Sequence, residues 1–204
     1  MLFSDSYLTV KTKSEALFKE RGSKFLTFIF PVKSEEEIKN HLTVLKKEHP
    51  NANHHCYAWR LGADKLAFRA NDDGEPSNTA GKPILGQIQA SDLTNVLIVV
   101  VRYFGGTLLG VGGLISAYKA AAANLISGAE ILEKFILFEY KVEFNEESIN
   151  LVMRILKEGA AKISSHTYEI NNSIIFQIKK QNSLKLEKDF IDLYTAKLTC
   201  LRTV

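Results

Sequence analysis

The sequence predicts an α+β protein with two domains, residues 1–130 and 131–204. Three observations support this prediction. An unbroken aliphatic run at 96–101 is typical of a strand buried on both faces, and it leads through a glycine-rich turn into an alanine-rich helical segment. The length of 204 residues suffices for one large domain or two small ones. In the second part of the chain, the order strand, helix, strand, strand, helix, strand is that of a ferredoxin-like domain.

The composition is that of an ordinary globular protein, with 46% hydrophobic residues and a formal net charge of +3. This mild charge does not require a nucleic-acid partner, although it leaves room for a local basic patch. The two cysteines, Cys56 and Cys200, fall in predicted strands, so we expect no disulfide framework and a reducing, cytoplasmic environment. The polar N-terminus does not resemble a signal peptide, and no apolar stretch approaches the roughly 20 residues of a membrane span. We therefore expect no membrane contact.

The first clear elements of the N-terminal half are a strand and an amphipathic helix. The strand is predicted over 24–30, where apolar residues fill both alternating faces, and Pro31 ends it. Ser34 caps the helix, and Glu37, three positions later, completes a capping box. The helix ends at His49, because a residue that precedes proline disfavours the helical conformation.

A hairpin, a polar loop and a second helix follow. The hairpin strands are predicted over 55–61 and 65–70, joined by a short turn that contains glycine. The loop at 71–82 is rich in residues that favour turns. The helix is predicted over 83–91 and begins at a proline, whose missing N–H is tolerated in a first helical turn.

The C-terminal half alternates strands and helices, and its first strand has alternating apolar and charged residues that predict one face in water. The predicted elements are a strand at 136–144, a helix between Asn145 and Gly159, strands at about 162–170 and 173–180 around a turn at Asn171-Asn172, a helix from Ser183 and a strand at 196–200.

Glycines around the start of the alanine-rich helix form the first candidate site. Backbone N–H groups exposed by glycines, together with the positive end of a helix dipole, are receptive to a phosphate group. The pattern lacks the Gly-Lys-Ser/Thr of a Walker loop and the third glycine of a dinucleotide-binding fingerprint. The alternative is structural, because small residues allow a strand and a helix to approach closely. The glycines are Gly105, Gly106, Gly110, Gly112 and Gly113.

Acidic residues in the polar loop, Asp72, Asp73 and Glu75, form a second candidate site. Carboxylates can ligate a hard cation or act as general acids and bases. Their spacing is not that of an EF-hand, because no glutamate occupies the twelfth position. The alternative is a solvated turn in which the acids cap helices or pair with Arg69 or Lys82.

The run His54-His55-Cys56 carries residue types that ligate metals. Neighbours on a strand point to opposite faces, so only His54 and Cys56 share a side. No second cluster of cysteine and histidine completes a zinc site, and we predict no metal and no cofactor. We interpret Cys56 as a buried structural residue rather than a nucleophile.

Cationic and aromatic side chains from separate elements form a candidate surface for nucleic acid or phosphate. If the fold gathers them on one face, the cations would hold phosphates and the rings would stack on bases. The alternative is ordinary surface cations and core aromatics, which the small net charge favours. We expect Arg102 and Lys119 at the rim of the glycine turn. The cationic residues are Arg21, Lys24, Arg60, Arg69, Lys82, Arg102 and Lys119, and the aromatic residues are Tyr57, Trp59, Tyr103, Phe104 and Tyr118.

Long motifs in the N-terminal half carry a resemblance. They are Arg21-Gly22-Ser23-Lys24-Phe25, Asp72-Asp73-Gly74-Glu75-Pro76, Thr79-Ala80-Gly81-Lys82-Pro83-Ile84-Leu85 and Val99-Val100-Val101-Arg102-Tyr103-Phe104-Gly105-Gly106. Through these motifs the chain resembles the IMPACT family, in particular its bacterial YigZ-like branch. The resemblance implies an N-terminal domain similar to the second domain of a small-subunit ribosomal protein, with a β-sheet and its helices on one face. It also implies a ferredoxin-like C-terminal domain similar to a late domain of elongation factor G.

The resemblance implies a nucleic-acid- or ribosome-binding protein with a role in the regulation of translation. This inference rests on fold analogy. One alternative is an enzyme or binding protein for a phosphorylated small molecule or nucleotide, with the glycine turn as anion site and Asp73 or Glu75 as acid or base. Another is a regulator whose ferredoxin-like half binds a protein partner. We favour binding over catalysis, and the sequence leaves the oligomeric state open.

Overall fold

The computed structural model of the chain describes residues 5–168 and 172–204. Sheets and helices occur in both parts of the chain, which confirms the predicted α+β class. Within the described residues, none of the helices has the length and apolarity needed to cross a bilayer. The turn predicted at Asn171-Asn172 begins outside the described residues.

The chain divides into two compact units. The N-terminal unit comprises residues 7–134, and the C-terminal unit comprises 135–204 together with Asp5 and Ser6. The chain leaves the N-terminal unit within strand β7 (Ile131–Phe135), which pairs with β1 (Ser6–Val10) in a two-stranded sheet. The predicted boundary at 130–131 lies before this strand.

The N-terminal unit is built around a five-stranded antiparallel sheet with the order β2-β3-β6-β4-β5. The central strand, β6, spans Val96–Tyr103 and is buried from Val96 to Arg102, as expected for the aliphatic run. The neighbouring strands are β2 (Ser14–Glu20), β3 (Ser23–Pro31), β4 (His54–Leu61) and β5 (Ala67–Asn71).

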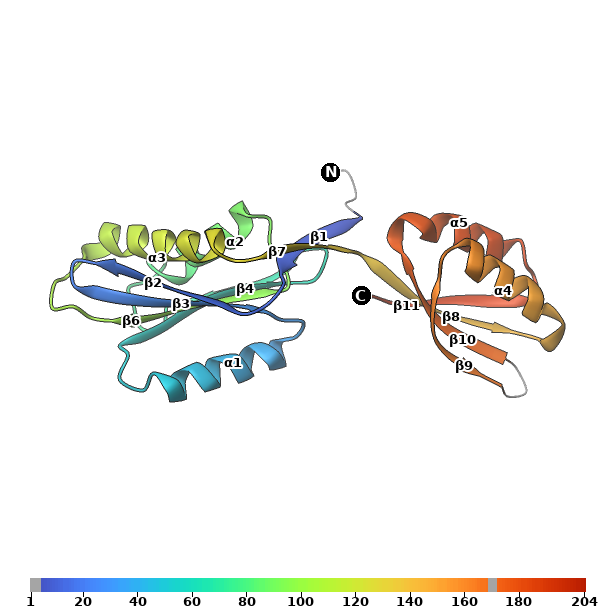
Figure 1. Ribbon diagram of the computed structural model, residues 1–204, viewed down its shortest axis with the longest axis horizontal. Coiled ribbons are helices and arrows are strands. Elements are labelled where there is room, and N and C mark those ends of the chain that lie inside the picture. Colours follow the sequence, from blue (N-terminus) through green and yellow to red (C-terminus); the bar gives the residue numbers. More distant parts are fainter. Residues whose placement is uncertain (1–4, 169–171) are drawn as a thin grey trace. The chain divides into compact units, whose positions relative to one another are not determined.

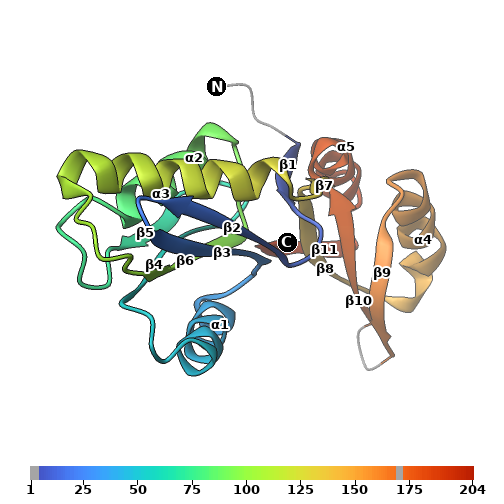
Figure 2. The same cartoon turned by 60° about the vertical axis from the view of Figure 1, so that its left-hand side comes forward.

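Helices cover both faces of this sheet (Figures 1 and 2). Helices α2 (Gly81–Ala90) and α3 (Gly110–Ser127) lie on one face, and α1 (Glu35–Glu48) lies on the other. The expectation of helices on one face is therefore corrected. The reason lies in β6, where Ile98 and its even-numbered neighbours pack toward α2 and α3, while Leu97 and its odd-numbered neighbours pack toward α1. A strand that is apolar on both faces needs a cover on each.

The predicted capping box begins α1. The Ser34 hydroxyl accepts a hydrogen bond from the Glu37 backbone N–H at 3.2 Å. The Glu37 carboxylate accepts one at 2.8 Å from the backbone N–H of Lys33, the residue before the N-cap, so the reciprocal bond lies one residue away from its place in the predicted box. The helix ends at Glu48, and His49 follows as its C-cap. Local sequence signals thus specify both ends of α1.

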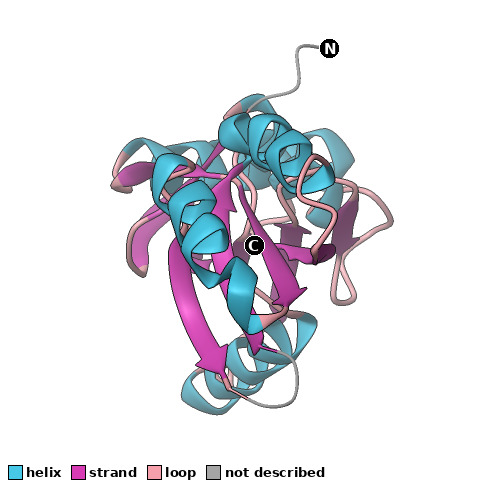
Figure 3. Ribbon diagram, turned by 90° about the vertical axis from the view of Figure 1, so that its right-hand side faces the viewer, coloured by secondary structure: helices cyan, strands magenta, loops and turns pink. Residues whose placement is uncertain are grey.

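The C-terminal unit is a four-stranded antiparallel sheet with the order β11-β8-β10-β9. Its chain order, strand, helix, strand, strand, helix, strand, is the one predicted from the sequence. Both helices pack on the face that carries Tyr140, Val142 and Phe176 (Figure 3). The elements are β8 (Leu137–Phe144), a 3-10 turn (Glu146–Ser148), α4 (Ile149–Glu158), β9 (Lys162–Thr167), β10 (Asn172–Lys179), α5 (Lys180–Ile191) and β11 (Ala196–Thr203).

Candidate functional site

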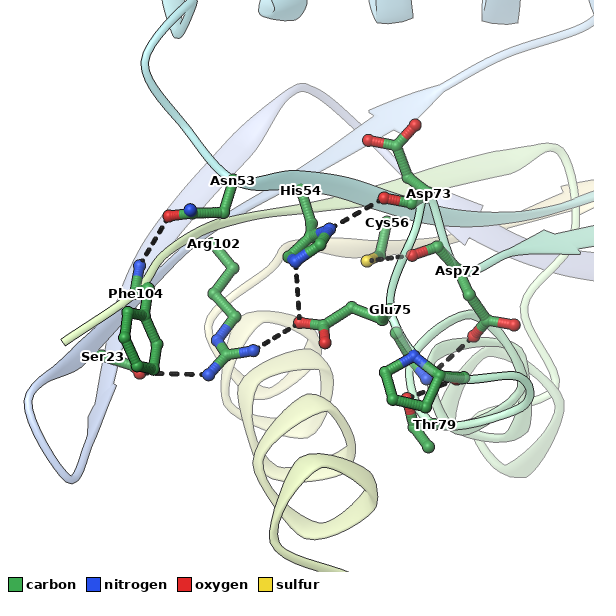
Figure 4. A network of polar contacts seen from close by, with 12 residues as sticks. Ser23, Asn53, His54, Cys56, Asp72, Asp73, Glu75, Thr79, Arg102 and Phe104 are labelled. Atoms are coloured by element: carbon green, nitrogen blue, oxygen red, sulfur yellow. Dashed lines mark hydrogen bonds and ion pairs between the residues drawn. The ribbon is translucent and has the colours of Figure 1, made fainter. Parts of the chain in front are cut away.

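A buried ion pair lies where β6 ends against α3 in the N-terminal unit (Figure 4). Arg102 Nη1 donates a hydrogen bond to Glu75 Oε1 at 2.6 Å, and the Tyr118 hydroxyl donates to the same oxygen at 2.8 Å. The side chains of Arg102 and Glu75 are only 6% and 4% exposed. A charge pair at this depth is stable only when it is well hydrogen-bonded, and Tyr118 supplies the further donor.

Ser23 links this ion pair to the loop that follows β6. Its hydroxyl oxygen accepts from Arg102 Nη2 and from the Gly105 backbone N–H, each at 3.3 Å. Arg102 Nε is buried and has no hydrogen-bond partner among the described residues. The guanidinium of Arg102 therefore has its main polar partner on one side, at Glu75, and reaches the glycine loop through Ser23.

His54 closes the other side of the network. Its Nδ1 lies 2.8 Å from the Asp73 carbonyl oxygen. Because a carbonyl can only accept, the hydrogen belongs to Nδ1. The Nε2 atom then faces Glu75 Oε1 at 3.9 Å (Figure 4). The sequence analysis considered His54 as a metal ligand and rejected it, and the structure places it beside the buried carboxylate.

Cys56 is a structural residue of this network. Its sulfur lies 3.0 Å from the Asp72 carbonyl oxygen and 3.2 Å from the Tyr118 hydroxyl. Burial raises the pKa of the Cys56 thiol far above its usual range, and it likewise raises the pKa of Tyr118. Both groups stay protonated and act as hydrogen-bonding partners, so Cys56 does not supply a thiolate nucleophile.

The carboxylates of the polar loop are engaged in the fold. Asp72 accepts from the backbone N–H groups of Ala80 at 3.0 Å, Gly81 at 2.8 Å and Asn78 at 2.9 Å, and it therefore caps the start of α2. This bears out the capping alternative for Asp72. No ion pair joins Asp72 to a cation within the described residues.

Asp73 ties the polar loop to α1 and β4. One carboxylate oxygen accepts from the His55 backbone N–H at 2.7 Å, and the other pairs with Lys46 Nζ at 3.2 Å. Desolvation lowers the pKa of the adjacent His55, which is buried. In the described part of the chain, no cluster of His, Cys, Asp and Glu is arranged to hold a metal ion. Glu75 pairs with Arg102, and Asp73 pairs with Lys46. The two residues considered as acid or base are thus both held by partners within the fold.

The glycines after β6 have different roles. A Cβ on Gly105 would lie 1.9 Å from the carbonyl carbon of Gly22, so two backbones meet there at a distance only glycine permits. This contact brings the β2–β3 turn, with exposed Arg21, against the loop. Gly106 and Gly110 have φ angles of +85° and +71°, which favour glycine. Packing thus accounts for Gly105 and backbone conformation for Gly106 and Gly110.

Neither close packing nor a positive φ angle requires glycine at position 112. A Cβ at this position would meet nothing within 4 Å, and its φ angle is not positive. It lies in the first turn of α3, whose N-cap residue, Leu109, makes no side-chain capping bond. At Gly113 a Cβ would lie 3.1 Å from the Leu109 Cβ, a tight packing contact. The exposed start of α3 therefore presents backbone N–H groups that no side chain of the described residues caps.

We use the name glycine edge for Arg21, Gly22 and residues 104–113. Phe104 is 46% exposed there, and the Arg102 guanidinium carbon lies 5.8 Å from its ring centroid. The Phe104 backbone N–H donates to the Asn53 side chain at 2.9 Å. The ring is thus held on a fixed backbone at the surface (Figure 4).

The structure does not gather all the predicted cationic residues. Lys24 pairs across strands with Tyr103, and Tyr103 bonds His49 at the end of α1, so both lie on the α1 face. Arg69 pairs with Trp59, whose side chain is in the core on the same face. Lys82 and Lys119 are exposed on α2 and α3, on the opposite face.

We expected Arg102 at the rim of the glycine turn, and this expectation is wrong because Arg102 is buried. Among the described cationic residues of this prediction, Arg21 is the one whose turn the Gly22–Gly105 contact brings against the glycines. The sequence analysis assigned no role to Ser23, and it placed Tyr118 among the rings that could stack on bases, whereas Tyr118 is buried and bonds Glu75. A signal for Tyr118 exists, since it lies on the buried stripe of α3 with Leu114 and Ala121, where a hydroxyl needs a partner.

Comparisons with known proteins cover the whole of this site. Residues 21–126 match the Impact N-terminal domain. An IMPACT family member of Haemophilus influenzae is 35% identical over 173 residues, which are 83% of this chain and 84% of that protein. IMPACT family member YigZ of Escherichia coli is 36% identical over 151 residues, covering 73% and 74%. A crystal structure described as that of a hypothetical protein aligns over 98% of this chain and 99% of its own, with a TM-score of 0.76 and 28% identity.

Proposed function

The chain belongs to the IMPACT family, and from that premise we propose that its N-terminal unit binds single-stranded RNA, free or on the ribosome, in a role that regulates translation. The observation that supports this most directly is the contact between Gly22 and Gly105. It sets the Arg21 turn against the loop that carries the exposed Phe104 ring and leads into the uncapped start of α3. A nucleotide offers a phosphate and a base, and the glycine edge offers a partner for each.

Phosphate would bind at the start of α3. Uncapped N–H groups and the positive end of the helix dipole favour an anion there, and Arg21, which is exposed and lies 3.8 Å from the Glu20 carboxylate, adds a positive charge. Gly112 fits this use, because a helical glycine costs about 1 kcal/mol relative to alanine and the fold does not need it. A phosphate oxygen that approaches the backbone closely would be obstructed by a Cβ.

A base would stack on Phe104. Base–aromatic stacking contributes about 1–3 kcal/mol per base and tolerates any sequence. The buried ion pair of Arg102 and Glu75 holds the backbone next to this ring in place. Arg102 bonds the Ser23 hydroxyl, which in turn accepts from the Gly105 N–H. In this arrangement Arg102 positions the edge and does not touch RNA.

The test is fluorescence anisotropy with a labelled single-stranded oligoribonucleotide of about 12 nucleotides, long enough for one such surface. We expect Arg21→Glu to weaken binding and Phe104→Ala to weaken it by about tenfold or more. Arg69→Glu is the matched control, since it makes the same charge reversal at an exposed residue outside the glycine edge. A ligand held by phosphates also binds less tightly as salt rises.

Two results would contradict the proposal. One is the absence of RNA binding at low salt. The other is an equal loss of affinity in Arg21→Glu and Arg69→Glu, which would indicate a diffuse electrostatic effect. In either case the glycine edge is not an RNA-binding surface.

A second candidate is a phosphorylated small molecule or nucleotide at the same helix start. The open space around Gly110 and Gly112 favours it, because a single phosphate needs only the uncapped N–H groups. It would be a binding site rather than a catalytic one, since Asp73 and Glu75 are held by other residues. A thermal-shift screen against nucleotides and sugar phosphates distinguishes it from RNA binding, because a ligand of the native state raises the melting temperature.

A further inference from the structure

A cavity of about 490 Å³ opens between α5 and β11 in the C-terminal unit. Buried Tyr140 and Phe190 form its floor, and Ile191 and Tyr194 stand at its mouth with exposed fractions of 71% and 96%. Strand β11 is an edge of the sheet, so the cavity lies at the side of the core. Its volume is in the range of pockets that hold small organic molecules. The remaining lining residues are Glu187, Leu193, Ala196, Leu198 and Cys200.

The cavity contains a carboxylate in apolar surroundings. The Tyr140 hydroxyl donates a hydrogen bond to Glu187 Oε1. Among the described residues, no lysine, arginine or histidine forms an ion pair with Glu187. The Glu187 carboxylate is half-buried beside Phe190 and Leu193, and among the described residues it has no counter-charge. A cation that enters the cavity would supply that charge.

We propose that this cavity binds a small organic cation, an apolar body that carries a protonated amine. The amine would bind the Glu187 carboxylate, and the apolar body would cover Phe190 and Leu198. An inorganic cation would leave the apolar lining in water, and a neutral apolar molecule would leave the carboxylate without a counter-charge. An amine on an apolar body satisfies both parts of the lining.

Tyr140 holds the carboxylate in place for such a ligand. Burial and the hydrogen bond to Glu187 raise the pKa of Tyr140 above its usual range, so the phenol remains a donor at neutral pH. Its ring is 2% exposed and stacks on Phe176, which fixes the position of the hydroxyl. Tyr140 is a positioning residue, and Glu187 is the group that would touch the ligand.

Cys200 supplies a direct measurement, because it lines the cavity and its residue is exposed. The other cysteine, Cys56, is fully buried and its thiol has a raised pKa, so a thiol reagent added to the native protein reports on Cys200. The experiment follows alkylation of the full chain by N-ethylmaleimide with intact-mass spectrometry. The probes are 2-phenylethylamine, which is protonated at neutral pH, and the neutral analogue 2-phenylethanol, compared at one pH.

We expect the amine to slow alkylation of Cys200 at concentrations about tenfold lower than the alcohol, the difference expected of a charge-assisted contact. In Glu187→Gln the amine and the alcohol should protect Cys200 equally. Asp189→Asn, two positions along the same helix and not part of the lining, is the matched control and should keep the preference. Tyr140→Phe keeps the charge and should keep a weaker preference, so the proposal remains testable if Glu187→Gln does not fold.

Equal protection by amine and alcohol in the unaltered protein would overturn the proposal, as would no protection by either probe. An undiminished amine preference in a folded Glu187→Gln would also overturn it. RNA binding by the N-terminal unit enters none of these measurements, so this proposal stands or falls separately.

Discussion

A guanidinium at the end of a buried strand can hold a ligand or hold the fold, and its partners decide which. Arg102 has Glu75 at 2.6 Å and Ser23 at 3.3 Å, and its side chain is 6% exposed. Strands β3 and β6 and the polar loop therefore meet at the guanidinium of Arg102. Arg102 acts on a ligand only through the loop that it positions.

Glu75→Gln is the sharpest test of this role. The substitution keeps the size of the side chain but leaves the Arg102 charge buried without its counter-charge, so we expect a loss of about 3 kcal/mol in the free energy of unfolding. Trp59 is the only tryptophan in the sequence and lies in the core of the N-terminal unit, so its fluorescence in urea reports on this unit. The matched control is Glu130→Gln, which breaks the exposed pair with Lys11 and should change stability by less than about 1 kcal/mol. Equal effects of both substitutions would contradict the structural role of Arg102.

The sequence revealed the residue types of the network but not its pairings. Glu75 and Arg102 are separated by 27 positions, and Ser23 and Arg102 by 79. No local pattern connects such residues, because the contacts are set by strand order. Asp72 differs, since its partners in the α2 first turn follow it closely, and the capping alternative could be stated from the sequence.

At the scale of elements, the loop from β6 to α3 shows that neighbouring glycines serve different ends. Gly105 is fixed by the backbone of Gly22, and Gly112 has open space around it. The sequence could list the glycines and offer packing or phosphate binding as alternatives. It could not assign a use to each one, because the assignment depends on which backbone passes beside it.

Alanine substitutions separate the two uses. Gly105→Ala forces a Cβ to within 1.9 Å of the Gly22 carbonyl carbon, and we expect a loss of about 3 kcal/mol in stability from the displaced backbone. Gly112→Ala should leave stability unchanged or raise it by up to about 1 kcal/mol, because alanine favours a helix. The same substitution should weaken RNA binding by obstructing the helix start. Urea unfolding and anisotropy on both variants measure these effects, and full RNA affinity in Gly112→Ala would contradict phosphate binding there.

Elements were predictable where the signal is local. The capping box of α1 and the alternation along β8 depend on residues within one turn or one strand, and both were identified. The sequence did not predict which face of the sheet α1 covers. That face depends on how the whole sheet buries Leu97 and Ile98 on opposite sides.

At the scale of the whole molecule, the hydrophobic cores of the two units are separate. The clusters around β6 contain only residues of the N-terminal unit, and the cluster around Tyr140 and Phe176 contains only residues of the C-terminal unit. A core buried in one unit contributes nothing to the other, so each unit has its own source of stability. The two proposed sites are likewise confined to one unit each.

Separate cores and separate sites predict separate unfolding transitions. A ligand stabilises only the unit whose native state binds it, so the oligoribonucleotide should raise the melting temperature reported by Trp59 and leave the C-terminal transition unchanged. The amine 2-phenylethylamine should do the reverse. Far-UV circular dichroism follows both units, and Trp59 fluorescence follows the N-terminal one, so the two probes on one sample distinguish the transitions. If each ligand shifted both transitions by the same amount, the units would unfold as one cooperative body, and their cores would not be energetically independent.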